Sequence, residues 1–280
     1  MKYQQILNEG YKILKLNNIK SYNLDTEILL TSTLKLNRSK LILNLDKKIK
    51  NNEKTFFFNL IKRRIKNEPV AYITGYKEFW RSKFKVNKNV LIPRPDTETI
   101  VEQALKELNN NSSKKILDIG TGSGCIIISL LKERKKCYGV GIDVSKNAIK
   151  LAKYNAKIQH IENRIKFFNS DIDKFCVDKY DLIISNPPYI KHHEIKCLEK
   201  DIKNHEPKIA LDGGFDGYSK IRLIIKKSSV LVKKKGKLIL EIGMNQEKEA
   251  IKILNLNGFY KVKIVKDLAG KNRCLISTKI

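Results

Sequence analysis

From Lys115 onward, short apolar runs alternate with helical stretches, and this alternation constrains the fold more than any other feature. Strands that alternate with helices form a parallel sheet with helices on both faces. The apolar runs predict strands at Ile116–Ile119, Tyr138–Ile142, Ile165–Phe168, Leu182–Ser185 and Leu238–Ile242. The stretches between them predict helices at Cys125–Arg134, Ala148–Lys157, Tyr218–Leu231 and Gln246–Leu256. We therefore expect an α/β fold with a doubly wound sheet.

Two further strands are predicted near the end of the chain. Tyr260–Val265 and Arg273–Thr278 are joined through a turn at Gly270. A connection this short joins antiparallel strands. The pair brings the expected sheet to seven strands and gives it an antiparallel edge.

The first 75 residues are predicted to form a separate helical bundle. Apolar side chains recur there at helical spacing, so that each helix has one face to bury. The three stripes are Tyr3, Ile6, Leu7, Tyr11 and Leu14; Leu24, Ile28, Leu29 and Leu34; and Phe57, Phe58, Ile61 and Ile65. We expect a helical domain at 1–75, a β-hairpin connector at 76–92 and the α/β domain at 93–280, where Asp96 or Thr97 caps the first helix.

The chain carries a formal net charge of +28, which favours contact with nucleic acid or the ribosome. A second explanation stays open, because 48 of the 57 basic residues are lysine and a coding bias produces the same excess. Residues 1–90 have 20 basic and 7 acidic side chains, which suggests that the helical domain docks a partner. Direct binding of nucleic acid is compatible with this charge but is not required.

Other sequence features exclude several classes of protein. The five cysteines form no CxxC pair and the four histidines no HExxH spacing, so neither a metal site nor a disulfide framework is predicted. No run of about 18 apolar residues predicts a membrane span, and the first residues lack the pattern of a signal peptide. We expect a cytoplasmic monomer that does not bind membranes.

A glycine-rich loop follows the first strand of the α/β domain. Its segment Asp118–Gly124 contains Gly120, Thr121, Gly122, Ser123 and Gly124. Glycines allow the tight turn and let the backbone approach a ligand, which in such sheets binds beyond the carboxyl ends of the strands. Asp118 at the end of the strand favours S-adenosylmethionine over a dinucleotide, because a carboxylate there can hold an ammonium group but not a diphosphate.

Two more carboxylates end neighbouring strands. Asp143 ends the second strand, where it can accept hydrogen bonds from ribose hydroxyls. Asp171 ends the third strand and is placed to accept a hydrogen bond from an adenine amino group. Either carboxylate alternatively caps a turn or a helix.

The motif Asn186-Pro187-Pro188-Tyr189 follows a buried-strand pattern and is the most specific feature of the chain. An amide nitrogen is a poor nucleophile, and a site activates it by accepting both of its N–H hydrogens. The Asn186 side-chain oxygen and the Pro187 carbonyl supply two acceptors, and prolines add no competing donor. Tyr189 can lie against the planar target group. The motif alternatively serves as a proline turn that ends a strand.

Almost the whole chain resembles the release factor glutamine methyltransferases, a family of class I amino-methyltransferases. Besides the glycine-rich loop and Asn186–Tyr189, the resemblance is carried by Glu68–Gly75, Glu78–Trp80, Leu91–Glu98, Glu206–Leu211 and Asp267–Gly270. It implies methyl transfer to the glutamine N5 in the Gly-Gly-Gln loop of release factors, with Arg94 among the residues that bind substrate and the N-terminal domain helping to dock the factor. Ile172 stands where the family often has an aromatic residue beside the adenine.

Two rival functions use the same features. A nucleic-acid adenine N6-methyltransferase also acts on a planar conjugated amine, but it needs a target-recognition region and base flipping. The only sizeable insertion near the site, residues 191–216, is short for that purpose. A basic RNA-binding protein that keeps a relic methyltransferase fold would not need Asp118, Asp143 and Asn186 together.

Overall fold

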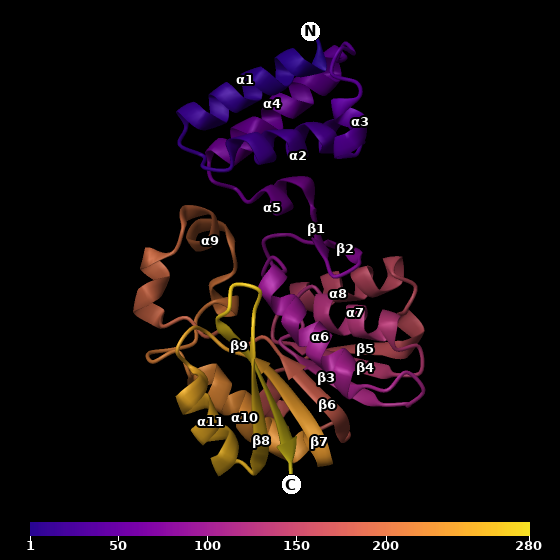
Figure 1. Ribbon diagram of the computed structural model, residues 1–280, viewed down its shortest axis with the longest axis vertical. Coiled ribbons are helices and arrows are strands. Elements are labelled where there is room, and N and C mark those ends of the chain that lie inside the picture. Colours follow the sequence, from indigo (N-terminus) through magenta and orange to yellow (C-terminus); the bar gives the residue numbers. More distant parts are fainter. The chain divides into compact units, whose positions relative to one another are not determined.

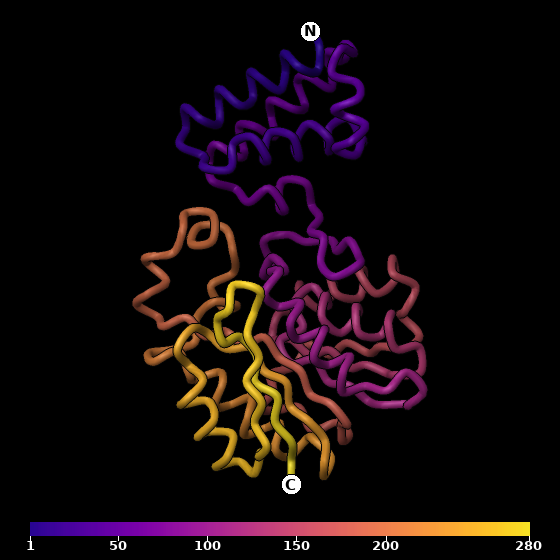
Figure 2. The backbone as a smooth tube through the Cα atoms, in the orientation of Figure 1, coloured from indigo at the N-terminus to yellow at the C-terminus, as the bar shows by residue number.

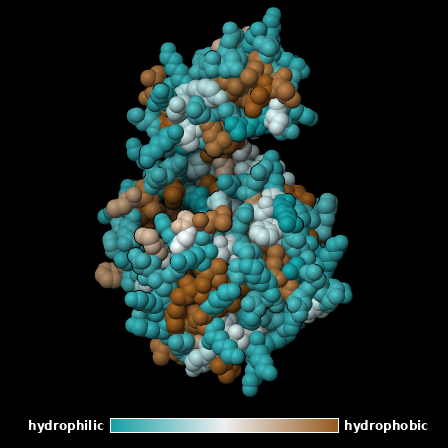
Figure 3. All heavy atoms as spheres, viewed as in Figure 1, coloured by the Kyte–Doolittle hydropathy of each residue, from teal (hydrophilic) through white to brown (hydrophobic).

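The computed structural model describes all 280 residues, and the chain divides into two compact units. The first unit consists of Met1–Tyr76 and Glu199–His205, and the second of Lys77–Leu198 and Glu206–Ile280. Hydrophilic residues, coloured teal, cover most of the face of each unit that Figure 3 shows. None of the helices combines the length and the apolar composition needed to cross a bilayer.

The first unit is entirely helical. Its core is formed by side chains spaced for one face of each helix, such as Ile6 and Leu14, with Phe57 and Ile61 packed against them. Its helices are α1 (Tyr3–Leu16), α2 (Tyr22–Leu34), α3 (Arg38–Ile42), α4 (Asn51–Ile65), α5 (Val70–Thr74) and α9 (Lys200–His205). Helix α9 belongs to this unit although it is distant in sequence.

The predicted apolar stripe of α2 is partly wrong. Leu24 and Ile28 are exposed, with 52% and 36% of their surface accessible, whereas Asp25 is buried. Asp25 Oδ2 accepts a hydrogen bond from Arg64 Nε of α4 at 2.7 Å, and both side chains are only 8% exposed. The buried face of α2 is therefore turned toward an ion pair that apolar periodicity does not reveal.

The second unit is built on one seven-stranded sheet, and this confirms the predicted fold class. The strand order is β5-β4-β3-β6-β7-β9-β8, with β9 antiparallel to both of its neighbours and the other pairs parallel. The Cα trace in Figure 2 shows β8 and β9 side by side at the C-terminus. The strands are β3 (Lys115–Ile119), β4 (Tyr138–Asp143), β5 (Ile165–Asn169), β6 (Tyr180–Ser185), β7 (Val232–Glu241), β8 (Phe259–Lys266) and β9 (Asn272–Lys279).

Helices cover both faces of this sheet, as Figure 1 shows. Helices α6 (Glu98–Glu107), α7 (Cys125–Glu133) and α8 (Lys146–Ile158) share one apolar cluster with one face of the sheet. Helices α10 (Ser219–Leu231) and α11 (Glu247–Leu256) share a second cluster with the other face. The runs in β3 and β6 are almost continuously apolar because both of their faces are buried.

Short elements complete the second unit. A hairpin of β1 (Tyr76–Phe79) and β2 (Ser82–Lys85) precedes the sheet. Five 3₁₀ helices lie in the connections: η1 (Pro95–Thr97), η2 (Glu162–Arg164), η3 (Ile172–Lys174), η4 (His192–Cys197) and η5 (Lys208–Ala210). Strand β7 begins at Val232, earlier than predicted, because Val232 pairs with Tyr180 before a register shift in the ladder.

The strand order places a crevice at the carboxyl end of β3. Its neighbours β4 and β6 lead into connections on opposite faces of the sheet, so the chain leaves the sheet in opposite directions beside β3. Register confirms that the three ends are level, because Ile119 of β3 pairs with Ile142 and with Ser185. Residues that follow these strands therefore meet at one place.

Candidate active site

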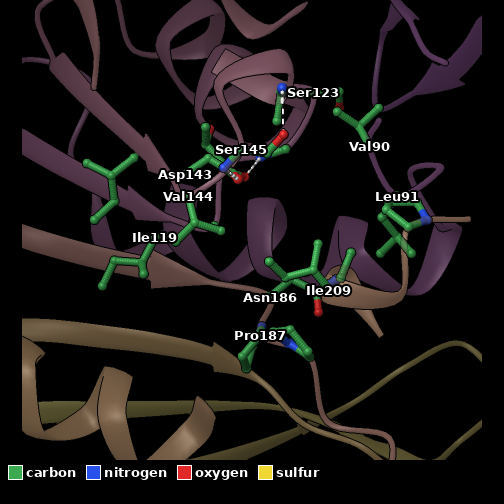
Figure 4. Close-up of a pocket in the computed structure, with 18 of the residues that line it drawn as sticks. Val90, Leu91, Ile119, Ser123, Asp143, Val144, Ser145, Asn186, Pro187 and Ile209 are labelled. Carbon is green, nitrogen blue, oxygen red and sulfur yellow. Dashed lines mark hydrogen bonds between the residues drawn. The ribbon is translucent and has the colours of Figure 1, made fainter. Parts of the chain in front are cut away.

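A cavity of about 350 Å³ lies at this crevice. Its wall includes residues from the loops after β3, β4, β5 and β6, such as Gly122, Asp143, Asp171 and Asn186. Figure 4 shows Asn186 and Pro187 on the side of the cavity away from Asp143. The four loops that sequence reasoning singled out thus surround one ligand-sized space.

The glycine-rich loop needs its glycines for two different reasons. Gly120, Gly122 and Gly124 have φ angles of +73°, +56° and +80°, which side-chain-bearing residues rarely adopt. A Cβ on Gly120 would meet nothing within 4 Å, so the backbone there faces open space, whereas one on Gly124 would lie 2.8 Å from Ile128 Cδ1. Gly120 therefore leaves room for a ligand, and Gly124 leaves room for the Ile128 side chain of α7.

Asp143 holds the loops on both sides of it. Its Oδ2 accepts a hydrogen bond from Gly122 N at 2.9 Å, and its Oδ1 accepts one from Ser145 N at 2.8 Å. Burial raises the pKa of this carboxyl, and the two N–H groups oppose the rise. Each oxygen keeps a further lone pair, so Asp143 can bind ribose hydroxyls while it supports the glycine-rich loop.

Asp118 lies beneath the loop and does not line the cavity. Its side chain is fully buried, Oδ2 accepts a hydrogen bond from the Thr121 hydroxyl at 2.7 Å, and Oδ1 has no partner. Burial raises the pKa of Asp118 to about 7. Thr121 lines the cavity, so the structure links Asp118 to the site through that hydroxyl. Direct binding of the donor's ammonium group by Asp118 stays a prediction.

The loop after β5 forms another part of the wall. Asp171 and Ile172 both line the cavity, and Asp171 Oδ1 accepts a hydrogen bond from Asp173 N at 3.2 Å. Asp171 therefore caps η3, as the alternative interpretation held, and its other oxygen remains available. Val144, which directly follows Asp143, also lines the cavity and is 48% exposed. The sequence analysis did not single out Val144, although it directly follows the predicted ribose ligand.

The motif after β6 lies partly in the cavity wall. Asn186, Pro187 and Pro188 line it, whereas Tyr189 does not. Asn186 Nδ2 donates a hydrogen bond to Thr97 Oγ1 at 3.1 Å, and the Tyr189 hydroxyl donates one to Glu241 Oε1 at 3.3 Å. Burial raises the pKa of Tyr189 above its ordinary value, so its hydroxyl stays protonated and acts as a donor.

The predicted cap of the first helix is confirmed in position. Helix α6 begins at Glu98 with Thr97 at its N-cap position, but the Thr97 side chain makes no cap hydrogen bond. The Thr97 hydroxyl instead accepts a hydrogen bond from Asn186 Nδ2. Thr97 lines the cavity and is a site residue that sequence reasoning missed, because only tertiary contact reveals it.

Arg94 lines the cavity and forms an ion pair with Glu206, whose side chain is 1% exposed. Glu206 also accepts a hydrogen bond from Ile92 N at 3.3 Å. The pair connects the loop before α6 with the segment after α9, and both segments contribute to the cavity through Leu91 and Ile209.

Of the predicted site residues, Gly120, Thr121, Gly122 and Ser123 line the cavity together with those described above. Gly124 does not line it and instead begins α7 as its N-terminal cap.

Comparison with known proteins agrees with this architecture. The family model "Methyltransferase small domain" matches residues 98–209, and "PrmC N-terminal domain" matches residues 5–75. The second unit is thus a methyltransferase. Over its full length the chain belongs to the release factor glutamine methyltransferase family.

Two relatives support the assignment of the chain to this family. A release factor glutamine methyltransferase of Clostridium acetobutylicum is 38% identical over 282 residues, which cover 100% of this chain and 99% of the relative. One of Fusobacterium nucleatum subsp. nucleatum is 40% identical over 98% of this chain and 78% of its own length.

Solved structures support the fold. A methyltransferase from Pyrococcus furiosus matches 79% of this chain and 98% of its own with a TM-score of 0.55 and 18% identity. A ribosomal protein L11 methylase from Lactobacillus delbrueckii subsp. bulgaricus matches 73% of this chain and 91% of its own length, with a TM-score of 0.51 and 19% identity.

Proposed function

We propose that this enzyme transfers the methyl group of S-adenosylmethionine to the side-chain amide nitrogen of a glutamine in a peptide-chain release factor. The observation that carries the proposal is the position of Asn186 in the wall of the donor cavity with its Nδ2 already bound to Thr97. Because Nδ2 is engaged, Oδ1 is the end of the amide that remains for a substrate N–H.

The residues of the cavity fit the donor. Open space over Gly120 admits a ligand against the backbone, and Asp143 offers acceptors for ribose hydroxyls. Apolar side chains such as Val144 and Ile172 provide surfaces for an adenine ring, and Asp171 an acceptor for its amino group. When bound, S-adenosylmethionine supplies an electrophilic methyl group on a sulfonium.

The motif after β6 activates and orients the acceptor. Asn186 Oδ1 and the Pro187 carbonyl accept the two N–H hydrogens of the substrate amide, which localises the nitrogen lone pair toward the methyl group. Pro187 and Pro188 have no N–H that would compete for these acceptors. No strong base is required before transfer, because the nitrogen becomes acidic once it is methylated and releases its proton afterward. Orientation supplies the rest of the rate enhancement.

The substrate glutamine is that of the Gly-Gly-Gln loop of the release factor, and Tyr189 and Arg94 belong to the substrate-binding set. The Arg94 side chain is 36% exposed, so it retains donors beyond its ion pair with Glu206. The helical domain at 1–75 docks the release factor, and the β-hairpin at 76–92 connects it to the domain at 93–280. That second domain catalyses methyl transfer. A translation factor as substrate places the enzyme in the cytoplasm, where we propose that it acts as a monomer.

Incubation with labelled S-adenosylmethionine tests the function. We expect label on a wild-type release factor and none on the same factor with its loop glutamine replaced. Asn186→Ala should abolish transfer while donor binding, measured by calorimetry, persists. Label on RNA or DNA but on neither factor would instead favour the adenine methyltransferase, and absence of donor binding would favour a relic RNA-binding protein.

A further inference from the structure

Gln246 is a buried polar residue next to the motif Asn186–Tyr189 that the mechanism above does not use. It occupies the N-cap position of α11, is 7% exposed and lies outside the cavity wall. Its side chain makes no hydrogen bond that caps the helix. The side chain instead binds backbone groups of three loops.

The three hydrogen bonds of the Gln246 amide connect these loops. Its Oε1 accepts from Gly243 N at 2.8 Å, in the loop after β7. Its Nε2 donates to Tyr189 O at 3.1 Å, in the loop after β6, and to Gly217 O at 3.3 Å, in the segment before α10. An amide NH₂ group has two hydrogens, so the two carbonyls account for both of them.

The backbone partners decide which end of the Gln246 amide faces which loop. Gly243 N–H can only donate, and the carbonyls of Tyr189 and Gly217 can only accept. The opposite orientation of the amide would leave all three backbone groups without this hydrogen bond, and unmade hydrogen bonds of buried groups are costly. Gln246 therefore specifies one arrangement of the three loops.

The loops approach one another closely around Tyr189. A Cβ on Gly217 would lie 2.7 Å from Tyr189 O and 3.0 Å from Gln246 Nε2, and one on Gly243 would lie 2.9 Å from Tyr189 Cδ2. The lack of a side chain at these two positions makes room for Tyr189. Tyr189 is thus held through its backbone as well as through its hydroxyl, which donates to Glu241 Oε1 at 3.3 Å.

The active-site motif needs such anchors because its two prolines donate no backbone hydrogen bond. The Pro187 carbonyl is required by the substrate amide in the proposed mechanism. The segment is therefore anchored at its ends. Asn186 Nδ2 donates to Thr97 Oγ1 at one end, and the Tyr189 carbonyl accepts from Gln246 at the other.

We propose that Gln246 is a positioning residue that acts through the Tyr189 backbone to hold the Pro187 carbonyl where it accepts a hydrogen from the substrate amide. Only Pro188 separates Tyr189 from Pro187, and its ring fixes φ, so a shift of the Tyr189 backbone is passed along the chain. The proposal rests on the proposed function and adds to it a residue outside the cavity wall that sets the geometry of the motif.

Two substitutions of similar size test the proposal. Gln246→Met removes all three hydrogen bonds. Gln246→Glu keeps an acceptor for Gly243 N, but in its ionised form it has no hydrogen for the two carbonyls. We expect each to lower kcat about 100-fold, because a displacement of about 1 Å has an effect of that order. KM for the release factor and Kd for S-adenosylmethionine should change less than about twofold, the range that leaves to groups that stay in place.

Calorimetry separates positioning from loss of structure. A partly unfolded enzyme would lower kcat by lowering the fraction of molecules that bind the donor, whereas a displaced motif leaves the stoichiometry of donor binding at that of wild type. Gln103→Met is the matched control, because Gln103 on α6 is 4% exposed and lies outside the cavity wall. The same exchange at that position should leave kcat unchanged.

The outcomes distinguish this proposal from the proposed function. If the wild-type enzyme places no label on the release factor, the proposed function fails. If the wild type is active and a folded Gln246 variant keeps the wild-type kcat, the proposed function stands and the positioning role is overturned. The role is also overturned if Kd for the donor rises as much as kcat falls, or if Gln103→Met loses as much activity. If one Gln246 variant is unfolded by circular dichroism, the other decides, and if both are unfolded, Gln246 serves the fold rather than the motif.

Discussion

The carboxylate of Asp143 at the end of β4 holds the glycine-rich loop by accepting a hydrogen bond from Gly122 N at 2.9 Å. The same side chain accepts a second hydrogen bond from Ser145 N at 2.8 Å and lines the donor cavity. One residue thus supports two loops that border the cavity, and its oxygens keep acceptor capacity for the ribose of the proposed donor.

Replacing Asp143 should weaken donor binding. A charge-assisted hydrogen bond contributes about 1.5–3 kcal/mol, so Asp143→Ala should raise the Kd for S-adenosylmethionine about tenfold or more in calorimetry. Asp178→Asn is a matched control, because Asp178 is exposed, pairs with Lys115 and is outside the cavity wall. An unchanged Kd for Asp143→Ala would remove Asp143 from the donor site.

Asp118 should make stability depend on pH. Its folded-state pKa of about 7 exceeds the ordinary value of 3.8, so the folded protein retains a proton that the unfolded chain has lost. The free energy of unfolding therefore falls as pH rises from about 4 to 7. In Asp118→Asn this contribution is absent, and the variant should gain stability relative to wild type between pH 5 and pH 8. Urea denaturation at several pH values measures the free energy of unfolding of both proteins. If this free energy depends on pH in the same way in wild type and in Asp118→Asn, the raised pKa of Asp118 is contradicted.

Removing Arg94 should destabilise the second unit. Glu206 is almost fully buried, so Arg94→Ala leaves a buried carboxylate with one partner fewer and should lower the free energy of unfolding by about 1–3 kcal/mol. The double variant Arg94→Ala with Glu206→Gln should recover part of the loss, because the uncompensated charge is removed. Urea denaturation gives both values. If the double variant is no more stable than Arg94→Ala, the pair does not account for the loss.

The ion pair between Arg64 and Asp25 should stabilise the first unit strongly. Arg64→Met leaves Asp25 buried without its main partner and should cost about 3–5 kcal/mol. Arg38→Met is the matched control, because Arg38 is 67% exposed where it pairs with Glu27, and exposed pairs contribute about 1 kcal/mol or less. Thermal unfolding compares the two variants, and equal losses would show that burial does not set the value of the pair.

Much of the second unit could be predicted from the sequence because its signals are local. The alternation of strands and helices predicted the order of elements, and the apolar runs of β3 and β6 were evident because both of their faces are buried. The glycine-rich loop and Asn186–Tyr189 were recognisable because each follows such a strand directly. The carboxyl ends of neighbouring strands then brought these loops to one cavity.

Polar partners distant in sequence were decided only by the tertiary structure. Asp25 and Arg64 are 39 residues apart, and their pairing turned the buried face of α2 away from its apparent apolar stripe. Thr97 and Asn186 are 89 residues apart, so a threonine that the local pattern assigned to a helix cap is also a partner of the Asn186 side-chain amide. Periodicity reports which face of an element is apolar, whereas a buried hydrogen bond requires two particular atoms to meet. The sequence by itself determined the strands, the helices and the loops that line the cavity, and folding determined which hydroxyl and carboxyl groups form hydrogen bonds with the residues in them.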